Sequence, residues 1–520
     1  MTASSAFRGG LHVLGTLLHV PAALALSTAL VALAFGEHWV ALPFLGTAGL
    51  LLALAQGLRR AFAAAAETRP SEAMTIAALA WLVVPATGVF PLVLVGQAAP
   101  LHGLDEAAVF ARPINALFES MSGFTSTGLT MSARPDQLPR AIQWWRSGAQ
   151  WIGGLGVVVL ALAVMRPGAL PLQLYRAEAR RERALPSVKS TVRVYLRIYV
   201  GFTLAGIVAL AAAGVPPWEA LNHGLTAVAT GGFTISERGA PLGGVGAQIV
   251  LMLLMIGGAQ SFAAAAAAVR ERRPAAFWRA GQQRLFWILL PSTVGATLLV
   301  AWIDDRAWVP EASVFQAVSA LCTAGFQTAD LAAWSIPGQL LLVAAMVLGG
   351  AAGSTAGGLK MQRIYLLTKG IAWRHRGLRL GEHELLRHDL DGAGMLPARA
   401  IALVESAAIL GVIWMGVLGF ATLAMLLVVP SSTPLEAVLL EVASAESNVG
   451  LSSGLTSADL PFAAKAILIA VMWVGRLEIV PVFVLVAAAA RLSASRRRAS
   501  SPEQDRRPAR RVRPRGARNR

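Results

Sequence analysis

Long apolar runs separated by short polar segments dominate this sequence. Ten runs approach or exceed the roughly 17–25 residues that a helix needs to cross the hydrocarbon core of a bilayer. They lie near residues 14–35, 40–57, 74–97, 147–165, 198–214, 248–269, 285–303, 337–357, 400–429 and 463–490. A lone span in lipid must satisfy its backbone hydrogen bonds within the segment, which only a helix does. The pattern therefore predicts an all-α protein with ten membrane spans.

Composition supports an integral membrane protein over a string of soluble domains. The chain of 520 residues is 56% hydrophobic and only 14% charged, against about 25% charged in typical soluble proteins. Its single cysteine, Cys322, excludes an intramolecular disulfide framework.

The net charge of +17 is distributed very unevenly over the loops between the predicted spans. One alternate set of loops and termini carries 37 of the 45 Lys and Arg residues. Cytoplasmic loops are enriched in basic residues, so this asymmetry predicts that both termini are cytoplasmic. Residues 491–520 carry twelve of the arginines and almost no apolar residues. We expect this tail to be disordered and to act near anionic lipid rather than on nucleic acid.

Four related segments lie between spans on the predicted outer side, at 114–130, 218–236, 314–330 and 435–453. Each has a short, mildly apolar stretch followed by a turn rich in small and hydroxyl residues. Aligned on their final glycines, the turns are Thr125-Ser126-Thr127-Gly128, Ala229-Thr230-Gly231-Gly232, Cys322-Thr323-Ala324-Gly325 and Ser447-Asn448-Val449-Gly450.

The apolar stretches of these segments are too short to span the membrane and are typical of re-entrant helices. Irregular backbone at membrane depth is tolerated only inside protein or along a water-filled cavity. Glycine allows the backbone to turn its carbonyls toward a common axis, and helix C-termini carry partial negative charge. Four such turns predict a cation filter built from carbonyl oxygens, with Thr, Ser and Asn able to add side-chain oxygens. The alternative is four ordinary loops of small residues.

The same pattern divides the chain into two N-terminal spans, a region of four repeated modules and a C-terminal tail. Two N-terminal spans occupy 1–73. Four pseudo-symmetric span–pore-helix–span modules around a central pore occupy 74–165, 195–269, 284–369 and 400–490, before the tail 491–520.

A glycine-rich segment, GGAAGSTAGGLK at 349–360, interrupts the predicted span near 337–357. It lacks the Gly-Lys-Ser/Thr ending of a phosphate-binding loop. Glycine weakens helices by about 1 kcal/mol against alanine, so we expect the span to break inside the membrane. The alternative is close helix packing through small residues. Its candidate gate residues are Gly349, Gly350, Gly353, Ser354, Thr355, Gly357, Gly358 and Lys360.

Arg476 lies midway along the last predicted span. A central arginine is costly in lipid and normally faces a partner or a water-filled path. Glu478 is two residues away and projects from another face of the helix, which leaves Glu405 on the preceding span as a possible partner. Arg476 is therefore either a barrier to cations in the pore or one half of a structural ion pair.

Several motifs resemble the superfamily of potassium transporters that includes TrkH, TrkG, KtrB and the plant and fungal Trk/HKT proteins. They are SMSGFTSTGLT, QWIGGLGVVVLALAV, ATGGFTIS, GSTAGGLKMQRI and GRLEIVPV, and the resemblance covers roughly residues 14–490. Two spans before the four modules are similar to TrkH and TrkG rather than KtrB.

The resemblance implies a multi-pass protein of the bacterial cytoplasmic membrane with a pseudo-fourfold pore, paired as a homodimer. It also implies cytoplasmic TrkA/KtrA-like regulatory subunits that bind the nucleotide, and no cofactor in this chain besides K⁺ in the pore. Gly128, Gly232, Gly325 and Gly450 match the filter glycines of potassium-selective members, while serine at the first of them accompanies sodium preference in some plant members. The resemblance places the 349–360 loop and Arg476 beneath the filter as gate elements and gives Lys360 a loop-anchoring role.

Two departures from the family pattern keep a Na⁺-translocating member open as an alternative. The lead residues Ala229, Cys322 and Ser447 differ from one another, and Glu446 is an unusual carboxylate before the fourth turn. A secondary transporter for another solute would leave the four outer segments without a role. A membrane enzyme would need a metal-ligand cluster, a nucleophile motif or paired mid-membrane acids, none of which the sequence shows.

Overall fold

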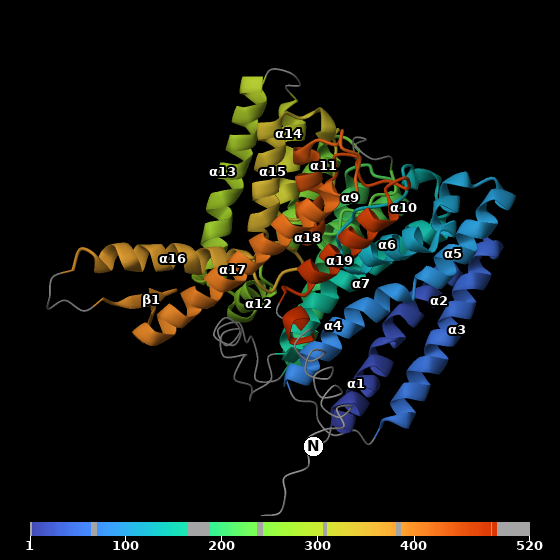
Figure 1. Cartoon of the computed structure of the whole chain (residues 1–520), viewed down its shortest axis with the longest axis horizontal. Helices are drawn as coiled ribbons and strands as arrows, with labels where there is room; N and C mark the ends of the chain where they lie inside the picture. The colour runs from blue at the N-terminus through green and yellow to red at the C-terminus, as the bar shows by residue number, and fades with distance from the viewer. Residues whose placement is uncertain are drawn as a thin grey trace, which may run out of the picture.

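The chain folds as a bundle of helices with one small hairpin (Figure 1). The computed structural model describes residues 3–63, 70–164, 188–236, 243–304, 309–380, 386–479 and 481–485. The tail 491–520 lies outside these residues. The longer helices are α1 (Ala3–Leu17), α2 (His19–Ala34), α3 (His38–Ala61), α4 (Pro70–Ala86), α5 (Val89–Ala98), α7 (Arg140–Val164), α9 (Val188–Ala212), α11 (Val245–Gly258), α12 (Phe262–Glu271), α13 (Gly281–Asp304), α15 (Ile336–Leu348), α16 (Met361–Gly377), α17 (Pro397–Leu426) and α19 (Phe462–Arg476).

Four helices of twelve residues each form a second class: α6 (Pro113–Phe124), α10 (Pro217–Val228), α14 (Pro310–Leu321) and α18 (Leu435–Glu446). At 1.5 Å per residue each is about 18 Å long, too short for a hydrocarbon core of about 30 Å. Three begin with proline at the first helical position, and Pro434 caps the fourth, which suits the fixed φ of that residue. Their last turns are completely buried. These helices coincide with the four short apolar stretches that the sequence predicts.

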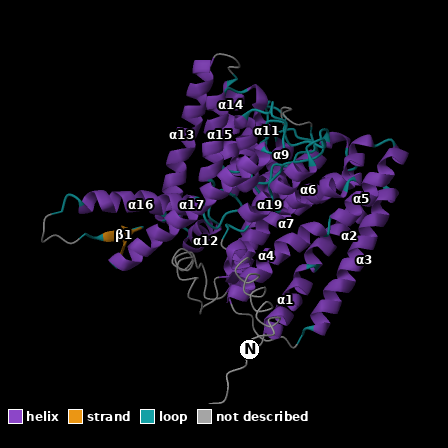
Figure 2. Cartoon of the chain, viewed as in Figure 1, coloured by secondary structure: helices purple, strands orange, loops and turns teal. Residues whose placement is uncertain are grey.

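Short 3₁₀ turns and one hairpin complete the described chain. The turns are η1 (Ala99–His102), η2 (Asp105–Ala111), η3 (Pro135–Gln137), η4 (Pro274–Arg279) and η5 (Leu331–Ala333). The antiparallel strands β1 (His388–Leu390) and β2 (Ala393–Met395) project beside α16 from one side of the bundle (Figure 1). Figure 2 shows teal loops gathered beside α6, α9 and α11.

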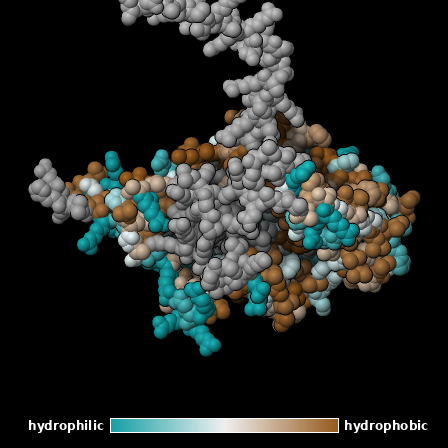
Figure 3. Space-filling model, turned by 90° about the horizontal axis from the view of Figure 1, so that it is seen from below, coloured by the Kyte–Doolittle hydropathy of each residue, from teal (hydrophilic) through white to brown (hydrophobic). Residues whose placement is uncertain are grey.

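Six helical runs of the described chain are long and apolar enough to cross a membrane: Arg8–Ala34, His38–Ala61, Met74–His102, Thr191–Ala212, Gly281–Asp304 and Pro397–Leu426. Their outer faces leave large apolar side chains exposed, among them Leu42 at 74% and Phe420 at 76%, and brown apolar surface is extensive in Figure 3. Water-soluble monomers rarely expose such contiguous apolar surface. The chain is a multi-pass membrane protein.

The spans predicted at 248–269 and 463–490 are both broken within the described residues. The span predicted at 248–269 is α11 and α12, which meet at an angle of 91°. Ser261 explains the break, because its backbone is extended and its side chain accepts a hydrogen bond from the Ala264 amide, which starts a new helix. The span predicted at 463–490 has its helix α19 end at Arg476, where Glu478 and Ile479 adopt positive φ. The predicted break of the span near 337–357 is confirmed, since α15 ends at Leu348.

The N-terminal helices hold the start of α7 through one carboxylate. Glu37, between α2 and α3, accepts hydrogen bonds from the amides of Arg140 at 2.6 Å and Ala141 at 3.0 Å. These amides lie in the first turn of α7, which has no internal partners for them. Burial raises the pKa of Glu37, and the two amide hydrogen bonds oppose that shift. Glu37 thus caps the N-terminus of α7 from about a hundred residues earlier in the chain.

Candidate functional site

The four glycine turns share one backbone conformation. Each short helix ends in a residue with right-handed φ, and the next residue is left-handed: Ser126 (φ 53°), Thr230 (49°), Thr323 (51°) and Asn448 (51°). Two residues later the glycines have φ of 95°, 74°, 75° and 105°. Left-handed non-glycine residues are uncommon and cost about 1–2 kcal/mol each. Four copies at one register show that the surroundings impose this shape.

The four turns contact one another in a closed ring. A side-chain carbon placed on Gly128 would collide with the carbonyl oxygen of Gly231, and one on Gly232 with that of Ala324. The same holds for Gly325 against the carbonyl of Val449, and for Gly450 against the carbonyl of Thr127. Each glycine therefore meets the carbonyl that precedes the next glycine, in chain order, and the fourth turn returns to the first. Only a hydrogen atom fits at these four positions.

A small hollow of about 30 Å³ lies at this ring. All four glycines line it, together with Thr130, Pro135, Arg146, Phe233, Thr234 and Gln327. Helix C-termini and closely spaced carbonyls around such a hollow suit a cation that has shed water. Among the described residues no three His, Cys, Asp or Glu side chains gather as a metal site.

Most hydroxyl and amide groups of the turns bond to protein, while the Ser447 hydroxyl and the Asn448 Oδ1 have no hydrogen-bond partner among the described residues. The Thr125 hydroxyl lies 2.7 Å from that of Thr127, and the Ser126 hydroxyl donates to the Gln150 carbonyl at 3.0 Å. The Asn448 amide donates to the Thr127 hydroxyl at 3.0 Å, and Cys322 is fully buried. Backbone carbonyls are thus the candidate ligands, and the side chains predicted to add oxygens bind the turns together.

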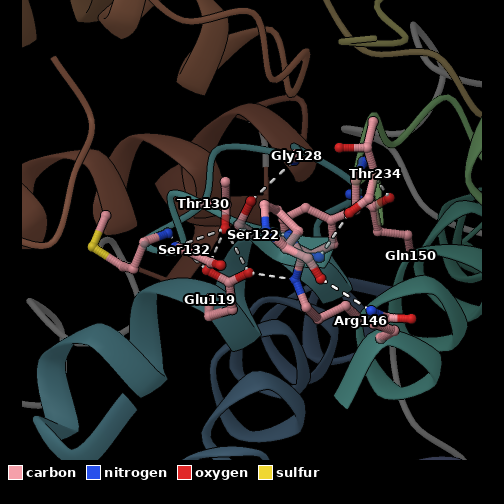
Figure 4. A network of polar contacts seen from close by, with 12 residues as sticks. Glu119, Ser122, Gly128, Thr130, Ser132, Arg146, Gln150 and Thr234 are labelled. Carbon is pink, nitrogen blue, oxygen red and sulfur yellow. Dashed lines mark hydrogen bonds and ion pairs between the residues drawn. The ribbon is translucent and has the colours of Figure 1, made fainter. Parts of the chain in front are cut away.

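A buried ion pair behind the first turn was not predicted from the sequence (Figure 4). Arg146 donates through Nε to Glu119 at 2.7 Å, and both side chains are 1% exposed. A second nitrogen of Arg146 donates to the Thr234 carbonyl at 2.9 Å, and its guanidinium lies 4.1 Å from the Phe233 ring centroid. The pair joins the first turn to the second. The sequence indicates this ion pair only through two opposite charges, Glu119 and Arg146, in otherwise apolar stretches.

The glycine-rich loop 349–360 lies directly against these turns. The Gly357 amide donates to the Thr323 hydroxyl at 2.7 Å, and the Gly358 amide to the Ser447 carbonyl at 3.1 Å. The Thr355 hydroxyl lies 3.0 Å from the Val228 carbonyl, at the end of α10. The loop therefore contacts the second, third and fourth turns together.

The glycines of this loop allow sharp turns and close approaches. Gly349, Gly353 and Gly358 have positive φ, and a side chain on Gly350 would collide with Ala356. Ser354 closes a turn by donating to the Ala351 carbonyl at 2.6 Å.

Lys360 ends the loop with φ of 75°, and its ammonium donates to the Ala356 carbonyl. That bond lies within the loop, and the anchoring role of Lys360 stays a prediction.

Arg476 connects this loop to the first turn. Its guanidinium donates to the Thr355 carbonyl at 3.2 Å and to the Gly153 carbonyl of α7 at 2.8 Å. It also lies 3.4 Å from the Ser126 hydroxyl. The side chain is 4% exposed.

The partner suggested for Arg476 from the sequence, Glu405, is wrong. Glu405 is exposed on α17, and the hydrogen bonds of Arg476 within the described chain go to other groups. Glu478 instead pairs with Arg363 of α16 at 2.5 Å. Backbone carbonyls accept from the two terminal nitrogens of Arg476, while its Nε has no hydrogen-bond partner among the described residues. Sequence spacing carries no information about carbonyl partners.

Glu446 occupies an apolar position of the pseudo-symmetric turns. Four residues before each glycine stand Phe124, Val228, Leu321 and Glu446, all at most 1% exposed. Both carboxylate oxygens of Glu446 lack a hydrogen-bond partner within the described chain. An unsatisfied buried polar group costs about 1–3 kcal/mol.

We expect Glu446→Leu to stabilise the protein by about 1–3 kcal/mol, because it removes an unsatisfied carboxyl group from an apolar site. Thermal unfolding in detergent measures the change. Glu446→Gln is the matched control, and it should gain less because an unsatisfied polar group remains. A Leu variant less stable than the parent would contradict this expectation.

Comparisons with known proteins identify the family. The sequence model of the TrkH family, which is described as a cation transport protein family, matches residues 47–494. The chain is 31% identical over 438 residues to the Trk system potassium uptake protein TrkH of Halomonas elongata, covering 81% of this chain and 86% of that one. It is 28% identical to an uncharacterized cation transporter of Methanocaldococcus jannaschii over 92% of this chain and 95% of the other.

A solved structure agrees with this assignment. The crystal structure of the potassium transporter TrkH from Vibrio parahaemolyticus matches with a TM-score of 0.77 and 26% identity. The match covers 92% of this chain and 98% of that one. With its closed ring of four glycine turns and a family match over most of its length, the chain belongs to the TrkH family of cation transport proteins.

Proposed function

We propose that this chain is the membrane-embedded pore of a K⁺ uptake system. The observation that carries the proposal is the closed ring in which each glycine meets a carbonyl of the next turn. Relatives with this family's fold are named as potassium uptake proteins and potassium transporters. A ring of carbonyls replaces the hydration shell of K⁺, so the ion crosses without a cofactor or a reaction.

The proposed filter comprises the four aligned turns, 125–128, 229–232, 322–325 and 447–450. Carbonyl oxygens at Thr127, Gly231, Ala324 and Val449 would coordinate the ion, because these lie at the glycine contacts. The positive φ values alternate along each turn, and such alternation turns successive carbonyls toward the same side.

The proposed gate is the loop 349–360 together with Arg476. The loop is hydrogen-bonded to three turns, and Arg476 holds it to the first turn and to α7. A fixed positive charge near the ion path repels K⁺. Displacement of the loop and of Arg476 together would open the path.

The proposed assembly is a homodimer in the bacterial cytoplasmic membrane, with both termini cytoplasmic. A cytoplasmic ring of TrkA/KtrA-like subunits would bind the regulatory nucleotide and act on the gate. The uneven distribution of basic residues supports this orientation.

Growth of K⁺-uptake-deficient bacteria at low K⁺ tests the proposal directly. Cells that express this chain with its regulatory partner should grow and take up ⁸⁶Rb⁺, and cells with an empty vector should not. Uptake of Na⁺ in preference to Rb⁺ would favour the sodium alternative. Absence of cation flux from a well-expressed protein in vesicles would contradict the pore assignment.

A further inference from the structure

One position repeats in all four short helices with different chemistry each time. Nine residues before each filter glycine stand Glu119, His223, Gln316 and Glu441. Their exposed fractions are 1%, 3%, 0% and 0%. A buried polar side chain is costly unless it is hydrogen-bonded, so each of the four needs a partner.

The two carboxylates bind the segment that leaves the filter. Glu119 accepts hydrogen bonds from the Thr130 hydroxyl at 2.8 Å and from the Met131 amide at 2.9 Å. Glu441 accepts from the Ser452 hydroxyl at 2.5 Å and from the Ser453 amide at 2.9 Å. The two amides lie at the same register, three residues after the glycine. Figure 4 shows the first of these contacts.

The two remaining side chains also bond to the segment beyond their glycine, His223 as an acceptor and Gln316 as a donor. The Ile235 amide donates to Nε2 of His223 at 3.4 Å, which places the ring proton on Nδ1. The Gln316 amide donates to the Thr328 hydroxyl at 3.2 Å. Ile235 and Thr328 also lie three residues after their glycines. A carboxylate, an imidazole and a carboxamide therefore perform one geometric task in four places.

We infer that these four residues form a brace ring that positions the outer end of the filter. The residues before each glycine continue directly from the short helix. The brace binds the residue three positions after the glycine to the same helix, twelve residues earlier in the chain. With both sides fixed, the glycine and the carbonyl before it cannot shift away from the neighbouring turn. Rigid support of this kind keeps the groups around a binding site at their working distance.

The inference predicts that K⁺ over Na⁺ selectivity falls when a brace side chain loses its hydrogen bond. It predicts parental selectivity when another side chain that can make the same hydrogen bond replaces it. It rests on the proposed filter. His223 and Gln316 are the informative members, because each makes one hydrogen bond to the segment beyond its glycine, whereas each carboxylate accepts several. Loss of one such hydrogen bond should lower K⁺ over Na⁺ selectivity about three- to tenfold.

The experiment measures Na⁺ competition against ⁸⁶Rb⁺ uptake in vesicles containing the full-length protein. His223→Leu and Gln316→Leu remove a brace, while His223→Gln retains an acceptor for the Ile235 amide. Ser313→Ala is the matched control, since Ser313 is buried on α14 and bonds only to the Val309 carbonyl. We expect selectivity to fall in both Leu variants and to stay at the parental value in His223→Gln and Ser313→Ala.

Thr328→Val protects the test against misfolding of a core variant. Thr328 is only partly buried, and the change removes one hydroxyl from the other end of the Gln316 brace at nearly constant volume. It should lower selectivity as Gln316→Leu does. Parental selectivity in Thr328→Val and in every Leu variant that folds would overturn the brace ring.

The filter proposal fails in a different way. If the filter is elsewhere, Gly128→Ser also leaves selectivity unchanged. If only the brace is wrong, Gly128→Ser changes selectivity and the brace variants do not.

Discussion

Gly128→Ser is expected to lower K⁺ over Na⁺ selectivity at least tenfold. Gly128 has φ of 95°, which costs a residue with a side chain about 1–2 kcal/mol, and its new side-chain carbon would collide with the Gly231 carbonyl. The ring must widen or tilt to accommodate it, and a factor of ten in discrimination corresponds to about 1.4 kcal/mol. Competition between Na⁺ and ⁸⁶Rb⁺ for uptake in vesicles measures the ratio.

Gly454→Ser separates backbone strain from the collision in the ring. Gly454 has φ of 90°, and a side-chain carbon there meets nothing within 4 Å. This variant should therefore lose some stability but keep the parental selectivity. A Gly128→Ser protein that folds and still discriminates as the parent does would exclude Gly128 from the filter.

Arg476→Ala is expected to raise the cation flux of the isolated protein about tenfold or more. The substitution removes hydrogen bonds to the Thr355 and Gly153 carbonyls. Hydrogen bonds to charged groups contribute about 1.5–3 kcal/mol net each, enough to shift a closed–open equilibrium by a factor of ten. It also removes a positive charge near the proposed path. Rubidium flux into vesicles without regulatory subunits measures the effect.

Arg476→Lys separates the effect of the positive charge from the effect of the hydrogen bonds to the two carbonyls. Lysine keeps the charge but lacks the planar fork that reaches two carbonyls at once. Its flux should lie between those of the parent and of Arg476→Ala. Unchanged flux in Arg476→Ala would remove this residue from the gate.

The sequence was most informative where one pattern occurred four times. The glycines could be aligned because the turns share length and residue size, and their positions agree with the observed ring. The break between α11 and α12 was missed because Ala259-Gln260-Ser261 hardly lowers the hydropathy of the run. A serine cap is decided by local geometry rather than by average polarity.

Long-range polar partners were the other part that the sequence could not supply. Glu119 and Arg146 are separated by 27 residues and lie on different helices. Arg476 donates to backbone carbonyls, which every residue has and which no spacing rule identifies. The brace ring was missed because its members are of three residue types, Glu, His and Gln. They have in common only their position nine residues before a filter glycine.

The closed ring also determines when the pore can exist during synthesis. The contact between Thr127 and Gly450 joins residues 323 positions apart, and it depends on a helix that begins at Leu435. Long-range contacts form late because the intervening chain must first be made and ordered. Three of the four turns can assemble while the ribosome is still adding residues, yet they leave one side of the ring open. The ring can therefore close only after Gly450 has been synthesised and ordered.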